Sequence, residues 1–509
     1  MVFRDARGFE LLASAAESRE LDRRTIEEVG IPGRVLMELA GAGTVEAVVQ
    51  RTGGRAGKAV VLCGGGQNGG DGYVIARHLA DRGWSVRCVA ASDPERLSGD
   101  ARANHGIWVA RGGRLELARA RVGGAVGHAL GHADVIVDAL FGTGLSRPIE
   151  GPAAALIDEA NQARHGLRVA VDLPSGLPAD GATPEGVVFQ AAMTATFGLA
   201  KPGLHHAAGA PWAGEVVVVG IALPRPLVDA VAPRWRLADE ASVAGLLPRR
   251  DAAAHKGHSG HVGVVGGFAG KEGAAVLASL GALRGGAGLV TWNHVGEGSG
   301  VERPPELMFH SIEEGLDARS TVIVIGPGLG QDADARRALE LALSSGRMLV
   351  MDADALNLWA ASRGDAGLPS DTVLTPHPTE AARLLGVETA EVQRDRGAAA
   401  ARLCERHGAT VVLKGARTVV ATPGRPSVIV PISEPVLAAA GTGDVLAGLI
   451  GALRAQGLDA HDAAVAGAFV HGLAGRRLGM RHPDGGVLAS EVADAVAEVR
   501  GELSLGWHP

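Results

Sequence analysis

Short apolar segments that end in a glycine-rich turn recur along this chain, and they constrain its fold more than any other feature. Residues 59–63 are followed by such a turn at 64–72, and residues 321–325 are followed by another at 326–330. A short apolar run, then a turn, then a helical segment is typical of a strand in a parallel sheet that helices cover. The pattern therefore predicts an α/β fold.

Two series of such strands follow one another, with a proline-rich segment between them. The expected strands are residues 59–63, 85–90, 135–138, 168–172, 191–197 and 215–220 in the first series and 261–265, 321–325, 348–352 and 410–413 in the second. At 509 residues the chain is too long for one ordinary domain. We therefore expect two different α/β domains, over residues 1–224 and 237–509, joined by a linker at 225–236.

Charge and cysteine content limit the partners and the compartment. The net charge of −7 gives no general attraction to nucleic acid or to an anionic membrane. No apolar run approaches the length that spans a bilayer, and the first residues lack the apolar core of a signal peptide. Cys63, Cys88 and Cys404 form no Cys-x-x-Cys pair, which is typical of a reduced compartment. We expect a cytoplasmic protein that binds neither nucleic acid nor membrane.

The sequence Gly-Thr-Gly-Asp at residues 441–444 opens an apolar helical run. The unpaired N–H groups and the dipole at such a helix start favour a phosphate or a developing negative charge. Asp444 beside that cradle could take a proton from a hydroxyl that is about to be phosphorylated. Because the turn at 64–72 lies near the other end of the chain, the two turns predict two active sites.

Polar residues interrupt the first turn. Its Gly-x-Gly-x-x-Gly pattern at 64–69 satisfies the dinucleotide fingerprint, but glycines at these positions often serve packing alone. Asn68, Asp138 and Ser175 all end or follow strands, so one oxygen-rich pocket could hold a monovalent cation. Helix capping by Asn68 and Asp71 is the simpler explanation, and both interpretations stay open.

Asp172 ends a strand before a Pro-Gly turn. Its carboxylate could act as a general acid or base, or it could serve the turn alone. Lys201 could be its partner, although a lysine at the surface is the default expectation.

The second series offers three further candidates. Residues 414–418 follow a strand and could hold a nucleotide phosphate, and His377 lies in a rigid Thr-Pro-His-Pro turn. The spacing of His255, His258 and His261 suggests a metal site. No carboxylate or cysteine cluster supports a metal there, so an ordinary glycine-rich loop is the better interpretation.

Together these motifs match one known family, in order, along almost the whole chain. The chain resembles the bifunctional NAD(P)H-hydrate repair enzymes, in which an NAD(P)HX epimerase domain precedes an ADP-dependent NAD(P)HX dehydratase domain. The matching segments are residues 36–41, 67–72, 138–144, 172–176 and 201–203 in the first half and 282–290, 326–330, 352–357, 375–380, 413–416 and 441–448 in the second. The resemblance implies a Rossmann-like first domain and a ribokinase-like second domain.

For the first domain, the resemblance implies inversion of the carbon that bears the hydroxyl of the hydrated dinucleotide. Asp172 would be the acid or base, Lys201 would assist it, and Asn68, Asp138 and Ser175 would bind a potassium ion. The residues that would bind the substrate are Gln67, Asn68, Gly69, Gly70, Asp71, Gly142, Thr143, Gly144, Leu145, Ser146, Arg147, Pro148 and Asp172.

For the second domain, the resemblance implies dehydration of the S-epimer at the expense of ADP. Asp444 would deprotonate the hydroxyl, which then attacks the terminal phosphoryl group of ADP, with a magnesium ion on the phosphates. Loss of phosphate would return NADH or NADPH, with AMP as the second product. The substrate would contact Ala274, Gly328, His377 and Asp444, and ADP would contact Lys414, Gly415, Ala416, Arg417, Thr418 and Gly443. The family forms homo-oligomers, so the resemblance implies one here.

The chain departs from the family pattern at two single positions, and residues 432–437 lack the asparagine that the family pattern leads us to expect near the nucleotide loop. Gln67 stands where the family usually has asparagine, and Ala440 stands where a glycine is usual. Two other classes of function stay open. A ribokinase-like kinase of a small hydroxymethyl vitamin precursor, with a regulatory first domain, explains the turn at 441–444 but not Asp138 and Asp172. A binding or scaffold role for the first domain is disfavoured because Asp172 is present.

Overall fold

The computed structural model describes residues 2–119, 122–145, 147–249, 256–296, 301–362 and 367–506. The chain forms two compact units. The first comprises Met1–Arg4 and Glu10–Trp235, and the second comprises Asp5–Phe9 and Arg236–Pro509.

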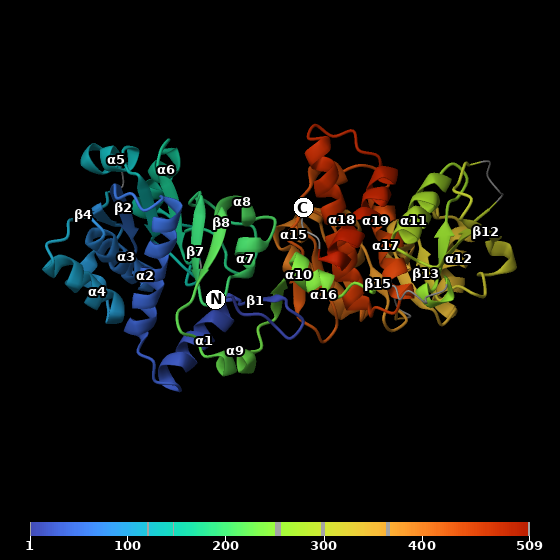
Figure 1. Ribbon diagram of the computed structural model, residues 1–509, viewed down its shortest axis with the longest axis horizontal. Coiled ribbons are helices and arrows are strands. Elements are labelled where there is room, and N and C mark those ends of the chain that lie inside the picture. The colour runs from blue at the N-terminus through green and yellow to red at the C-terminus, as the bar shows by residue number, and fades with distance from the viewer. Residues whose placement is uncertain are drawn as a thin grey trace. The chain divides into compact units, whose positions relative to one another are not determined.

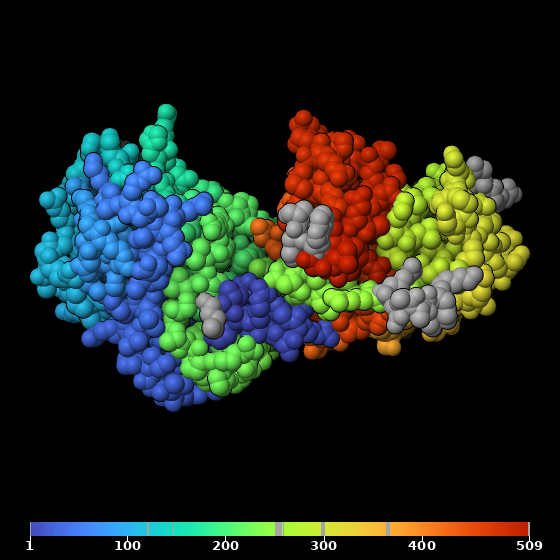
Figure 2. Space-filling model, in the orientation of Figure 1, coloured from blue at the N-terminus to red at the C-terminus, as the bar shows by residue number. Residues whose placement is uncertain are grey.

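A helix occupies most of the segment expected to be a linker. This helix, α9 (Arg225–Val231), packs against α1 (Ala15–Glu27) of the first unit (Figure 1, Figure 2). Leu227 and Val228 of α9 are buried in the same apolar cluster as Leu21 of α1. The first unit therefore continues beyond residue 224.

The first unit contains a parallel sheet in the order β4-β3-β2-β5-β6-β7-β8. These strands are β2 (Lys58–Cys63), β3 (Ser85–Ala90), β4 (Leu115–Leu117), β5 (Val135–Ala139), β6 (Leu167–Val171), β7 (Met193–Phe197) and β8 (Glu215–Val219). The chain leaves β2 toward β3 and later returns to pair β5 on the other side of β2. The carboxyl ends of β2 and β5 thus form a topological switch point, where ligands of open α/β sheets bind.

Helices cover both faces of this sheet. Val61 of β2 lies in one apolar cluster and Val60 in another, as expected because successive side chains of a strand point to opposite faces. The remaining elements of the unit are β1 (Glu10–Leu12), α2 (Gly33–Arg51), α3 (Gln67–Asp81), η1 (Pro94–Arg96), α4 (Gly99–Ala110), α5 (Gly124–Gly131), α6 (Gly151–Gln162), α7 (Pro202–His205) and α8 (Ala210–Ala213).

The second unit contains a larger mixed sheet in the order β9-β18-β17-β16-β15-β14-β13-β10-β11-β12. The pairs from β12 to β16 are parallel, and β16, β17 and β18 pair antiparallel. The strands are β9 (Trp235–Leu237), β10 (His261–Gly266), β11 (Leu289–His294), β12 (Met308–Ser311), β13 (Val322–Ile325), β14 (Met348–Met351), β15 (Val373–Leu374), β16 (Thr410–Leu413), β17 (Val419–Ala421) and β18 (Ser427–Ile429).

Two helices of the second unit cross at very short range, namely α11 (Glu272–Arg284) and α17 (Thr442–Ala455). A Cβ atom on Gly448 would lie 1.8 Å from the Ala278 carbonyl oxygen, so only glycine permits this approach. The other helices and 3₁₀ turns are α10 (Glu240–Ala244), η2 (Lys256–Ser259), η3 (Ile312–Glu314), α12 (Ala333–Ser344), α13 (Ala353–Ala361), α14 (Pro378–Leu385), α15 (Thr389–Arg394), α16 (Arg396–His407), η4 (Pro435–Leu437), α18 (Ala460–Arg481) and α19 (Ala489–Leu505). The crossing fixes the start of α17, which carries Asp444.

Both units have the α/β architecture that the strand pattern predicted. Within the described ranges, no helix has the length and apolar character needed to cross a bilayer. Cys63, Cys88 and Cys404 are buried and unpaired.

Candidate active sites

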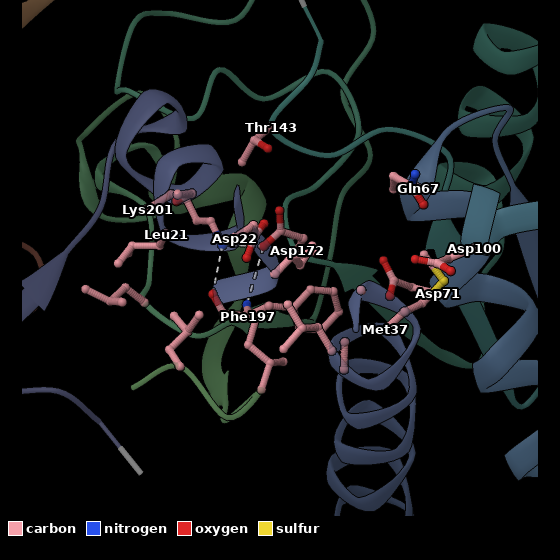
Figure 3. A pocket seen from close by; sticks show the side chains of 18 residues that line it. Leu21, Asp22, Met37, Gln67, Asp71, Asp100, Thr143, Asp172, Phe197 and Lys201 are labelled. Carbon is pink, nitrogen blue, oxygen red and sulfur yellow. Dashed lines mark hydrogen bonds and ion pairs between the residues drawn. The ribbon is translucent and has the colours of Figure 1, made fainter. Parts of the chain in front are cut away.

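A cavity of about 260 Å³ opens in the first unit at the carboxyl ends of its strands (Figure 3). Residues that follow β2, β5, β6 and β7 line it, together with one face of α1 and one face of α2. The lining side chains used below are Asp22, Met37, Gln67, Asp71, Thr143, Asp172, Phe197 and Lys201. The cavity therefore gathers two polar residues of the turn at 64–72 with the two candidates for acid–base chemistry.

Asp172 and Lys201 form a buried ion pair. The Lys201 ammonium donates to Oδ1 of Asp172, to the Thr196 hydroxyl at 3.2 Å and to the Phe197 carbonyl at 3.1 Å. Lys201 is only 2% exposed, so the expectation of a surface lysine was wrong. Asp172 has a φ of +67°, which is costly for a residue other than glycine. The strained backbone and the ammonium together fix the direction of the carboxylate.

Two further carboxyl groups face this pair. Burial raises the pKa of Asp71 well above its usual value, and the charges of Asp172 and Asp22 add to the effect. Protein atoms around the Asp22 carboxyl displace part of its hydration water, and this loss of solvation raises its pKa to about 6. The charge of Lys201 opposes the shift, and the charge of Asp172 adds to it. The sequence analysis did not identify Asp22, because α1 precedes every motif and its apolar pattern gave no sign of which face meets the cavity.

Two of the three candidate potassium ligands, Asp138 and Ser175, contact each other. The backbone N–H of Ser175 donates to Oδ2 of Asp138 and its hydroxyl donates to Oδ1, both at 2.7 Å. Asp138 is fully buried, and burial raises its pKa to about 6, although the hydrogen bonds from Ser175 act to lower it. Nδ2 of Asn68 is buried without a hydrogen-bond partner in the described residues. A buried carboxylate beside hydroxyl and amide groups is a donor set that suits a hard monovalent cation.

The loop at 142–148 reaches the cavity through its first residues. Thr143 lines the cavity, and a Cβ on Gly142 would lie 3.4 Å from both Asn68 Oδ1 and Asp172 Oδ2. The backbone N–H of Leu145 donates to the Gly142 carbonyl at 3.3 Å. Of the remaining predicted contacts, Gly144, Leu145, Arg147 and Pro148 do not line the cavity, and Ser146 lies outside the described residues.

Gly69 and Gly70 serve close packing as well. A Cβ atom on Gly69 would lie 2.0 Å from the Gly64 carbonyl oxygen, and one on Gly70 would lie 2.8 Å from Met37. Gly69 lets α3 begin close to the turn that follows β2, and Gly70 lets α3 pack closely against α2. The polar lining from this turn comes from Gln67 and Asp71.

Two cavities of the second unit meet at the start of α17. One, of about 530 Å³, is lined by Ala274, Gly328, Glu380, Gly441 and Asp444 among others. The other, of about 610 Å³, is lined by His377, Lys414, Gly415, Ala416, Thr418, Thr442 and Gly443 among others. The turn at 441–444 therefore belongs to both cavities, with Asp444 on one side and Gly443 on the other. This arrangement suits transfer of a group from a ligand in one cavity to a ligand in the other.

Asp444 is tuned to exchange protons near neutral pH. Burial, with the charge of Asp352 next in size, raises its pKa to about 7, while Lys414 opposes the shift. Lys414 donates to Oδ1 of Asp352 at 2.6 Å, and the Thr375 hydroxyl donates to the same oxygen at 2.8 Å. Asp352 was only part of a motif in the sequence analysis. Its position at the carboxyl end of β14 was the signal available for it.

Two predicted ligands lie elsewhere than expected. His377 lines the cavity of Lys414 and not the cavity of Ala274, Gly328 and Asp444. Its Nδ1 accepts the N–H of Thr379 at 3.1 Å, so it caps α14. Arg417 lines neither cavity.

Arg396 holds the loop that follows β16. Its guanidinium donates to the carbonyl oxygens of Leu413 and Lys414, both at 2.9 Å, and to that of Ala416. The loop that lines the larger cavity is thereby fixed by a buried cation. Sequence reasoning had no signal for this contact, because α16 contains no motif.

Of the three spaced histidines, the structure describes only the side chain of His261. His261 is buried and contacts the Thr291 hydroxyl at 2.8 Å through Nε2. His255 and the side chain of His258 lie outside the described part of the chain. Within that part, no group of three histidine, cysteine or acidic side chains could hold a metal ion.

Two family models match the chain. The model described as YjeF-related protein N-terminus matches residues 33–203, and the model described as NAD(P)H-hydrate dehydratase matches residues 262–498. Curated relatives named bifunctional NAD(P)H-hydrate repair enzyme match most of both chains. The relative from Moorella thermoacetica is 40% identical over 95% of this chain and 95% of its own. The chain belongs to the family of bifunctional NAD(P)H-hydrate repair enzymes.

Other relatives of the bifunctional NAD(P)H-hydrate repair enzyme family agree. The relative from Escherichia coli is 38% identical over 86% of this chain and 84% of its own. Among solved structures, the ADP/ATP-dependent NAD(P)H-hydrate dehydratase from Bacillus subtilis, co-crystallised with ATP and Mg²⁺, is 29% identical with a TM-score of 0.45. It covers 52% of this chain and 97% of that chain. The two model matches fall in different units, so family membership favours two enzymatic units over the kinase and scaffold alternatives.

Proposed function

We propose that this chain repairs hydrated NADH and NADPH in two steps, epimerising the R- and S-forms in its first unit and dehydrating the S-form in its second at the expense of ADP. The observation that carries this proposal is the presence of two separate acid–base centres. Asp172, paired with Lys201, lines the cavity of the first unit, and Asp444 lines one of the two cavities that meet at the start of α17 in the second. The epimerase step would supply the dehydratase with the form it accepts.

In the first unit, Asp172 exchanges the proton of the hydroxyl on the reduced ring. Lys201 keeps the Asp172 carboxylate in place and stabilises its charge. A potassium ion held by Asn68, Asp138 and Ser175 would supply positive charge beside the substrate phosphates. The glycine-rich turn would let the backbone approach the dinucleotide closely.

In the second unit, the smaller cavity would hold the hydrated ring, and the larger one would hold ADP on residues 414–418 and Gly443. Asp444 removes the proton from the hydroxyl, and the oxygen attacks the terminal phosphoryl group of ADP. The N–H groups at the start of α17 stabilise the charge that develops during transfer. A magnesium ion would neutralise the ADP phosphates. Phosphate then leaves with the carbon–oxygen bonding electrons and the adjacent ring carbon loses a proton, so the products are NADH or NADPH, AMP and phosphate.

This proposal accounts for residues that a vitamin-precursor kinase leaves unused. A kinase needs Asp444 and the N–H groups of the turn, but it has no role for the buried Asp172–Lys201 pair. The expectation of a homo-oligomer remains part of the proposal, and sedimentation of the full chain tests it.

The deciding experiment follows absorbance of reduced nicotinamide after the protein is added to mixed-epimer NADHX. Nearly complete recovery of NADH that depends on ADP and magnesium is the expected result. Recovery of NADH that stops at the fraction of one epimer would show that the dehydratase is active and that the first unit is not an epimerase. No recovery with ADP or ATP would refute the proposal and favour the kinase.

A further inference from the structure

The carboxyl group of Asp22 has no partner in the first-unit cavity. Asp22 lies on α1 and lines the cavity, and its side chain is exposed there. In the described residues it takes part in no hydrogen bond or ion pair. By contrast, neighbouring acidic residues of α1 are paired: Glu20 binds Arg23 and Glu17 caps the helix start. Asp22 is thus the acidic residue of α1 that is left free to meet a ligand in the cavity.

Figure 3 shows the Asp22 carboxylate next to Asp172 and Lys201. The charges of both neighbours act on Asp22, as expected for groups that line the same cavity. Lys201 donates to Asp172, so one carboxylate of the group is neutralised as an ion pair. The protein around Asp22 and the nearby Asp172 charge favour its protonated form and raise its pKa to about 6. Environments that differ in this way separate a proton donor from a proton acceptor.

The epimerase reaction needs both a proton donor and a proton acceptor. Hydration of NAD(P)H puts a hydroxyl on the ring carbon next to the ring nitrogen, so that carbon is a hemiaminal. A hemiaminal carbon can invert as a sugar hemiacetal does, through an open aldehyde. Opening requires a base on the hydroxyl and an acid on the nitrogen at the same edge of the ring, which suits two neighbouring carboxyl groups.

We propose that Asp22 is the second catalytic residue of the epimerase, donating a proton to the ring nitrogen while Asp172 accepts the hydroxyl proton. This assignment rests on the proposed epimerase function of the first unit. It goes beyond the resemblance, which gives acid–base roles in the first unit to Asp172 and Lys201 only.

The electrons and protons balance without any further reactant. Asp172 takes the hydroxyl proton, the oxygen electron pair forms the aldehyde, and the bond between the carbon and the ring nitrogen breaks. The nitrogen receives that bond's electron pair and the proton of Asp22. Rotation presents the other face of the aldehyde, the nitrogen attacks it, Asp22 recovers its proton, and Asp172 protonates the oxygen. Both residues end in their starting states, and the carbon–oxygen bond never breaks.

The test uses the full chain without ADP, so that the dehydratase is silent, and follows the conversion of one NADHX epimer into the other by chromatography. Asp22→Asn should lower kcat about 100-fold or more, with KM and the affinity for NADHX changed less than about threefold. Asp22→Glu, which restores a carboxyl, should recover at least about tenfold of that loss. Glu20→Gln on the exposed side of the same helix is the matched control and should match wild type.

A pH profile and an isotope supply independent readouts. Activity requires one proton on the Asp22–Asp172 pair, so the wild-type rate should fall as the pH rises above about 6. The residual rate of Asp22→Asn should show no such fall in its pH profile. Besides Lys201 and Asp172, the charge of Asp71 interacts with that of Asp22, and Asp100 also lines the cavity. In water labelled with ¹⁸O, the product should keep its original hydroxyl oxygen.

Three results would overturn the assignment. They are an active wild type with Asp22→Asn within threefold of it, a loss that falls on substrate affinity instead of kcat, and oxygen exchange at every turnover. A wild type with no epimerase activity would refute the proposed function itself together with this role. Thermal denaturation checks that Asp22→Asn folds, and Asp22→Ser takes its place if it does not.

Discussion

The pH dependence of the dehydratase step follows directly from the environment of Asp444. To accept the hydroxyl proton, this carboxyl must be ionised, and its pKa is raised to about 7 by burial and by the charge of Asp352. A group with that pKa is ionised in about a tenth of molecules at pH 6 and about nine tenths at pH 8. We therefore expect the ADP-dependent rate from S-NADHX to rise about tenfold between pH 6 and pH 8. An aspartate with an ordinary pKa would leave the rate flat over this range.

Asp352→Asn tests the cause of the shift. The substitution removes a negative charge that raises the pKa of Asp444, and it frees Lys414, whose positive charge lowers that pKa. Both effects lower the pKa of Asp444, so the pH range in which the rate rises should move to lower pH. The assay is kcat/KM for S-NADHX between pH 5 and 9 at saturating ADP, with the exposed Asp334→Asn on α12 as the control. A limb that stays in place or moves to higher pH would refute this electrostatic account, and so would a flat profile for the wild type.

Four other substitutions have defined outcomes. Asp444→Asn should abolish dehydration and spare epimerisation, and Asp172→Asn should do the reverse; loss of both activities from either change would contradict two separate sites. Lys201→Met leaves Asp172 buried without its cation, so it should destabilise the first unit by about 3 kcal/mol, measured by urea denaturation; an unchanged midpoint would show that the pair contributes no net stability. Gly448→Ala places a Cβ 1.8 Å from a carbonyl oxygen of α11 and should cost the second unit about 2 kcal/mol or more; retained stability would mean that the helices separate easily.

Much of the fold could be predicted because its signals are local. A run such as residues 59–63 followed by a glycine turn specifies a covered parallel strand and a helix start without reference to the rest of the chain. The turn at 441–444 predicted a helix N-terminus with a carboxylate beside it, and α17 begins there. The same local logic identified Asp172 at a strand end. Ligand-binding residues of α/β sheets collect at those ends, so candidates near them could be found from the sequence.

Domain limits and individual contacts were less accessible. The linker prediction missed α9, because its prolines start a helix as readily as they break one, and Leu227 is buried in an apolar cluster that includes residues distant in the sequence, among them Leu21 of α1. His377 was expected beside the substrate, yet it lines the other cavity and its Nδ1 caps α14. A turn motif shows that a histidine is presented, but not to which side.

The sequence by itself determined the α/β class, the two-unit division, the family and the residue types at the strand ends. These depend on local periodicity, on glycine where the backbone turns tightly, and on motifs that stay contiguous in the chain. Only the tertiary structure decided that Asp22 of α1 meets Asp172 and Lys201, and that Asp352 acts on Asp444. Charges act through space and burial is set by the whole fold, so the protonation of a carboxyl depends on neighbours that lie far away in the sequence.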